Sequence, residues 1–73
     1  MAPSEPVADL APSAKLVYKV LEHNGQLTQQ QIAEESLLPA RTVRHALSEL
    51  ESVDAIEERI HFQDARQRLY DLQ

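Results

Sequence analysis

Apolar residues in the first third of the chain recur with helical spacing. They are Leu16, Val17, Val20 and Leu21. This i, i+1, i+4, i+5 pattern is typical of a helix with one face packed on a core. Ser13 is the expected N-cap of this helix, and Asn24-Gly25 is its expected end, because Asn and Gly tolerate left-handed cap geometry. The pattern therefore predicts a first helix between these two signals.

Two more helical patterns follow within a short distance of each other. The first begins at Thr28, an expected N-cap that forms a capping box with Gln31, and ends near Ser36. The second lies within residues 37–53, with Pro39 in its first turn. Its apolar stripe consists of Val43, Ala46, Leu47 and Leu50. Two helices joined by so few residues predict a helix-turn-helix unit.

The periodicity then changes to that of strands. Residues 55–62 and 66–72 alternate in part between apolar and polar positions, and a turn is expected near residues 63–65. The apolar positions of shared parity are Ile56, Ile60 and Phe62 in the first strand, and Tyr70 and Leu72 in the second. With a short extended link at residues 26–27, the order of elements predicts an α+β fold. We expect a winged helix-turn-helix of three helices plus a C-terminal β-hairpin wing.

Length and composition narrow the class of protein. Seventy-three residues allow one small domain, expected over residues 12–73 after a flexible arm at residues 1–11 that is rich in Pro, Ala and acidic residues. The absence of cysteine excludes disulfides and thiolate metal sites. No apolar run approaches a membrane span, and the N-terminus lacks a secretory signal pattern. These features predict a cytoplasmic protein that does not contact a membrane.

The charges are sorted along the chain. There are 12 acidic residues against 7 Lys and Arg, a net charge of -5, which argues against coating of nucleic acid through overall positive charge. All the arginines nevertheless lie in the second half of the chain, whereas residues 49–58 carry five acids and no base. Arg41, Arg44, His45 and Ser48 lie opposite the apolar stripe of the third predicted helix. One face of this acidic protein is therefore expected to be cationic.

A helix with one apolar and one cationic face can dock on a domain and enter the major groove of double-stranded DNA. Arginine contacts guanine edges or phosphates there, and His and Ser can do either more weakly. The candidate DNA contacts on this helix are Arg41, Thr42, Arg44, His45 and Ser48. An arginine at the tip of the hairpin could reach the neighbouring minor groove.

The ordered motifs "LTQQQIAEES", "RTVRHALSELE" and "IEER" leading to "DARQRLYDL" resemble the winged helix-turn-helix of MarR-like transcriptional regulators, particularly short archaeal ones. The resemblance covers residues 14–72. In that family an Asp-x-Arg signature lies in the wing, and Asp64 and Arg66 match it. The resemblance implies that Arg66 points to DNA while Asp64 shapes the wing. Arg68 is expected either to contact a phosphate or to lean on the sheet.

Two departures from the family pattern limit what the resemblance implies. Val53-Asp54 stands where the family often has Gly between the recognition helix and the wing, and Asp is among the residues that tolerate left-handed geometry. The long flanking helices that form the family's dimer have no counterpart in the sequence. From the footprint alone we expect a homodimer or a larger assembly on paired half-sites. No cofactor and no small-molecule ligand can be identified.

Other interpretations stay open at this point. The helix arginines could be ordinary solvated residues, Asp64 and Arg66 could act as a structural turn pair, and Arg59 is expected to pair with an acid such as Glu57. The three histidines lie on different elements without ligand spacing, and no nucleophile–base pair is present, so neither a metal site nor an enzyme is predicted. The main alternative function is a winged-helix protein-interaction module that uses its acidic surface.

The excess of acidic residues also suggests that the protein works at high salt concentration. Many acids, five Arg and only two Lys resemble the composition of proteins from salt-loving archaea. In molar salt the Debye length falls to about 3 Å, so long-range attraction to DNA weakens. A halophilic DNA-binding protein would therefore depend on close base and shape contacts.

Overall fold

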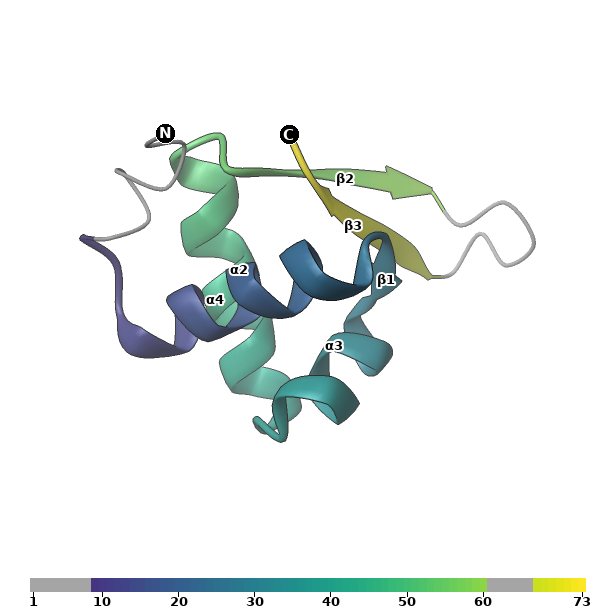
Figure 1. Ribbon diagram of the computed structural model, residues 1–73, viewed down its shortest axis with the longest axis horizontal. Helices are drawn as coiled ribbons and strands as arrows, with labels where there is room; N and C mark the ends of the chain where they lie inside the picture. Colours follow the sequence, from purple (N-terminus) through teal and green to yellow (C-terminus); the bar gives the residue numbers. More distant parts are fainter. Residues whose placement is uncertain (1–8, 61–66) are drawn as a thin grey trace.

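The computed structural model describes residues 9–60 and 67–73 (Figure 1). Its elements, labelled as in Figure 1, are α2 (Pro12–Asn24), β1 (Leu27–Thr28), α3 (Gln29–Ser36), α4 (Ala40–Ser52), β2 (Ile56–Ile60) and β3 (Arg68–Leu72). The three helices lie on one side of the small sheet, and the β2–β3 hairpin extends away from them (Figure 1). The predicted α+β winged helix-turn-helix fold is confirmed.

The sheet is antiparallel and has the order β1-β3-β2. Tyr70 in the central strand lies opposite Leu27 on one side and Glu58 on the other. The extended link expected at residues 26–27 is thus a third strand that ties the helices to the hairpin. Ile56 is buried, but Ile60 is 67% exposed, because the far end of β2 extends beyond the helices. Ile56 and Ile60 share a parity along the strand, but only Ile56 contributes to the core.

Two helices begin at other residues than predicted, because of a proline near the start of each. Helix α2 begins at Pro12 with Ala11 as its N-cap, so Ser13 lies inside the helix and caps nothing. Proline suits this first position because its φ is already helical and its missing N–H would have no partner there. Pro39 is the N-cap of α4 and not a residue of its first turn, since the helix begins at Ala40.

The other predicted helix boundaries are confirmed. Gly25 has a φ of 79° and donates its N–H to Leu21 O at 2.8 Å, which ends α2. The capping box of α3 is complete. The Gln31 N–H donates to Thr28 Oγ1 at 3.1 Å, and the Thr28 N–H donates to Gln31 Oε1 at 2.9 Å. These bonds satisfy two amide groups that a helix start would otherwise leave without acceptors.

One core holds the three helices and the sheet together. Its buried members are Ala14, Val17, Tyr18, Leu21, Ile32, Val43, Ala46, Leu47, Leu50, Ile56 and Tyr70. Every predicted apolar position of α4 is among them, and Tyr18 and Tyr70 are buried as well. Leu16, predicted to lie on the buried face of α2, is 41% exposed. Across residues 9–60 and 67–73, no helix is long and apolar enough to cross a membrane.

Candidate nucleic-acid interface

The burial of one face of α4 fixes the direction of the other. Helix α4 packs against both α2 and α3 through its apolar stripe. The opposite face carries Arg41, Arg44, His45 and Ser48, all exposed, while Thr42 at its edge is half-buried. Four of the five candidate residues on this helix therefore share a solvent-facing surface. We call Arg41, Arg44, His45 and Ser48 the recognition face.

The cations of the recognition face differ from most others in how they are paired. Lys19, Arg59 and Arg68 each form an ion pair with an acidic side chain. The pairs are Lys19–Glu22, Arg59–Glu57 and Arg68–Glu58. Within the described ranges, Arg41 and Arg44 form no ion pair, and neither does Lys15 on α2. No intramolecular carboxylate therefore competes with an external anion for these two arginines.

His45 marks the edge of this cationic region. Its Nε2 lies 3.7 Å from Glu49 Oε2, one turn further along α4, and its side chain is 71% exposed. The other carboxylate oxygen of Glu49, Oε1, is buried and has no hydrogen-bond partner among the described residues. The character of α4 thus changes from cationic to acidic between these two residues.

A shallow hollow adjoins the start of α4. It has a volume of about 650 Å³, and its lining includes Gln29, Gln30, Ala40, Arg68 and Tyr70. The hollow thus lies where the N-terminus of α3, the N-terminus of α4 and the base of the hairpin meet. The cation in this lining, Arg68, is itself paired with Glu58 of the neighbouring strand.

A winged helix-turn-helix DNA-binding family model matches residues 10–57, about two thirds of the chain. The chain belongs to this family. No curated protein sequence matches it. The predicted resemblance to this class of fold is confirmed, whereas the archaeal and halophilic character stays a prediction.

Solved structures with the same fold include a transcriptional regulator and two proteins in complex with DNA. FabT of Streptococcus pneumoniae, solved in complex with DNA, has a TM-score of 0.80 and 25% identity over 89% of this chain and 46% of its own. PcaV of Streptomyces coelicolor has a TM-score of 0.84 and 22% identity, over 89% and 46%. The C80S variant of MarR from E. coli, with operator DNA, has a TM-score of 0.83 and 16% identity, over 92% and 48%. The chain spans about half the length of each of these proteins.

In this winged helix domain, the base of the wing is held by ion pairs along the sheet. Arg68 Nε lies 2.9 Å from Glu58 Oε2 on the neighbouring strand. Of the two roles expected for Arg68, contact with a phosphate or packing on the sheet, the structure shows packing on the sheet. The predicted pairing of Arg59 with Glu57 is confirmed. Asp64 and Arg66, the wing residues implied by the family resemblance, lie outside the described residues.

The acidic stretch predicted at residues 49–58 brings two carboxylates together at the C-terminal end of α4, a proximity that the sequence did not show. Glu51, in the last turn of α4, lies near Glu58 of β2. Burial, then the negative charge of Glu58, raise the pKa of the Glu51 carboxyl. Burial and the same two carboxylates raise the pKa of Tyr70, which Arg68 partly offsets. Only the folding of β2 beside α4 brings these groups together.

Both ends of α4 connect through a residue with positive φ that is not glycine. Asp54 has a φ of 57°, so the expectation that Asp takes left-handed geometry at the usual glycine position is confirmed. Leu37, between α3 and α4, has a φ of 63° and was not singled out from the sequence. Its position directly after Ser36, at the predicted end of α3, was the available signal, because glycine is the usual residue there.

Proposed function

We propose that this chain binds double-stranded DNA in a sequence-specific way and regulates transcription, with α4 in the major groove. The observation that carries the proposal is the pair Arg41 and Arg44, which are exposed on one helical face and have no ion-pair partner among the described residues. A groove about 12 Å wide accepts an α-helix, and arginine is the side chain most often used to read guanine. Family membership and DNA-bound relatives of the same fold support this function.

The candidate residues divide into two kinds of contact. We assign base reading to Arg41, Arg44, His45 and Ser48 on the recognition face, with Thr42 at its edge positioning the helix. We assign Arg68 to a phosphate of the DNA backbone, which requires Arg68 to exchange its ion pair with Glu58 for the phosphate. In the wing we assign Arg66 to the adjacent minor groove and Asp64 to the shape of the turn, following the family resemblance.

We further propose that the chain acts as a homodimer. The described part of one subunit measures 34 × 23 × 20 Å. Two half-sites one helical turn apart are separated by about 34 Å, so two subunits side by side match such a palindromic site. Sedimentation of the full chain with and without DNA tests this. A single subunit bound per duplex at all concentrations would contradict it.

The experiment for the proposed function has two steps. The full chain first selects duplexes from a random 30-base-pair pool, and the selected duplex is then used in mobility-shift titrations. The Arg41→Ala/Arg44→Ala double variant should bind roughly a hundredfold more weakly, since each lost arginine contact removes about 1–3 kcal/mol. Arg59→Ala, which removes an arginine already paired with Glu57, is the matched control and should bind like the parent.

Two results would contradict the proposal. If the pool yields no preferred sequence, binding is not sequence-specific. If the double variant and the Arg59→Ala control bind equally well, α4 is not the reading element.

A further inference from the structure

Leu37 combines two unfavourable features in one residue. Its side chain is 88% exposed, the highest value among the exposed large apolar side chains in the described part of the chain. Its backbone is left-handed, with φ 63° and ψ 22°. Left-handed geometry brings the Cβ of an ordinary residue too close to the backbone, so glycine and asparagine are the usual occupants. Leucine has neither a conformational nor a solvation advantage at this position.

The fold itself does not explain the leucine. The Leu37 N–H donates to Ala33 O at 2.9 Å and ends α3, a role of the backbone that any residue could fill. The next residue, Leu38, is half-buried and packs against the core, so the apolar contact of this turn is already made. A strained residue whose side chain serves no internal contact points to an external one.

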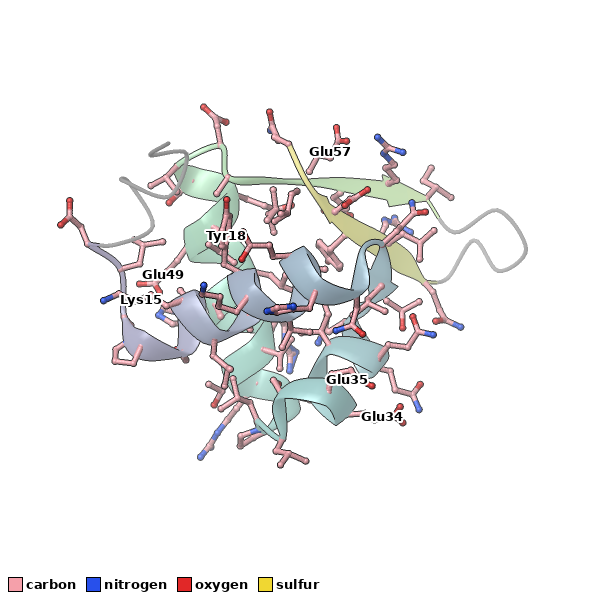
Figure 2. The ribbon with its side chains drawn as sticks, viewed as in Figure 1. Lys15, Tyr18, Glu34, Glu35, Glu49 and Glu57 are labelled. Carbon is pink, nitrogen blue, oxygen red and sulfur yellow. The ribbon has the colours of Figure 1, made fainter. Side chains whose placement is uncertain are left out.

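The surroundings of Leu37 indicate what that external contact is. Leu37 precedes the N-cap of α4 by two residues and Arg41 by four, and the first turn of α4 contains no acid. The nearest acids in sequence, Glu34 and Glu35, lie on the side of α3 that faces away from α4 (Figure 2). Leu37 is thus an apolar side chain beside the cationic end of α4, where a duplex bound by Arg41 and Arg44 would pass.

Other exposed apolar residues do not combine high exposure with a left-handed backbone. Leu16 is 41% exposed on α2 and Ile60 is 67% exposed on β2, but both have ordinary helical or strand backbones. Asp54, the other described non-glycine residue with positive φ, is of a type that tolerates this conformation. These residues therefore serve as controls for exposure and for strain separately.

We propose that Leu37 contacts DNA directly, with its side chain packed on apolar atoms at the edge of the major groove. Two groups on DNA offer such atoms, the C5 methyl of thymine and the carbons of deoxyribose. This inference rests on the proposed function, because it requires a duplex seated on the recognition face. Burial of the side chain against DNA offsets the cost of keeping leucine in this turn.

The test compares Leu37→Gly and Leu37→Asn with the parent on the selected 30-base-pair duplex. Both variants suit the left-handed backbone, so their thermal midpoints should equal or exceed that of the parent. Both should nevertheless bind the duplex about tenfold more weakly, the size expected for a lost leucine contact. Asp54→Gly and Leu16→Ala are the controls for relief of strain and for loss of exposed apolar surface, and each should bind within about twofold of the parent.

A second duplex, with uracil in place of every thymine, distinguishes the two apolar sources. If the parent loses about fourfold on uracil and the Leu37 variants lose nothing further, the contact is the thymine methyl. If the variants are weaker than the parent by the same factor on both duplexes, the contact is deoxyribose. Either pattern supports the inference.

The inference and the proposed function fail in different ways. If the parent binds the selected duplex and either Leu37 variant binds within about twofold of it, the inference is wrong and the proposed function stands. If the parent selects no sequence and the arginine double variant behaves like the parent, both are wrong.

Discussion

The two ends of helix α4 have similar backbone turns but differ in the charge of their side chains. Each end adjoins a non-glycine residue of positive φ, Leu37 before the helix and Asp54 after it. At the N-terminal end, Arg41 and Arg44 form no ion pair within the described residues. At the C-terminal end, Glu51 lies near a second acid, Glu58, and the arginines of the hairpin are held in ion pairs with Glu57 and Glu58. The net charge of -5 therefore conceals a cationic surface that is left for a partner.

Charge reversal at the N-terminal end should have the largest effect. Arg44→Glu places a carboxylate against the phosphates and base edges, so binding of the selected duplex should fall by at least about a hundredfold. Arg59→Glu, the same change on the hairpin, should weaken binding far less. Fluorescence anisotropy titrations at fixed salt measure both. Equal losses for the two variants would mean that net charge, and not the position of the arginine, controls binding.

Substitutions of Asp54, the residue of positive φ after α4, should change the stability of the protein. Asp54→Ala should lower the free energy of unfolding by about 1 kcal/mol, because alanine is strained at positive φ whereas aspartate is less so. Asp54→Gly should be at least as stable as the parent, and neither variant should change DNA affinity by more than about twofold. Urea unfolding gives the stabilities. If Ala and Gly are equally stable, the turn does not depend on a left-handed residue.

The acidic end also predicts a response to salt. Self-repulsion among the acids should be screened by KCl, because the Debye length falls from about 10 Å at 0.1 M to about 3 Å at 1 M. The thermal midpoint should then rise by roughly 5 °C over this range. Circular dichroism melts in KCl and in an uncharged osmolyte separate screening from general stabilisation. A midpoint indifferent to KCl would contradict both the repulsion and the predicted halophilic character.

The smallest expected effect concerns Glu51. Its raised pKa means that folding favours the protonated carboxyl. That stabilisation is complete below the ordinary pKa of 4.5 and is lost as the pH rises through the higher pKa of the folded state. Glu51→Gln should therefore raise the thermal midpoint by roughly 2 °C at neutral pH and by nothing near pH 3. Glu22→Gln, which removes the acid paired with Lys19 on α2, is a control that should not raise the thermal midpoint at neutral pH.

The local part of the fold was predictable because it depends on neighbours in the sequence. The capping box at Thr28, the end of α2 at Gly25 and the apolar stripe of α4 were all read correctly. Ser13 failed as a cap because the adjacent Pro12 already starts the helix. The third strand was expected only as an extended link, because two residues at 27–28 become a strand only when β3 pairs with them.

Only the part of the candidate interface that lies on one helix was predictable from the sequence. The recognition face follows from helical periodicity, since four residues opposite the apolar stripe must face solvent. The hollow beside α4 joins elements far apart in the sequence, so no local pattern contains it. The acidic stretch at residues 49–58 was visible in the sequence, but the proximity of Glu51 to Glu58 depends on how β2 folds back beside α4. Leu37 was overlooked because the conformation of a turn between helices depends on the angle at which the two helices pack.

The central claim is that DNA lies against the N-terminal end of α4. Titration of the ¹⁵N-labelled full chain with the selected duplex, followed by two-dimensional NMR, tests it most directly. We expect the amide signals of residues 37–48 to shift strongly, while those of residues 51–58 stay in place. The largest shifts at residues 51–58, with Arg41 and Arg44 unmoved, would contradict the account.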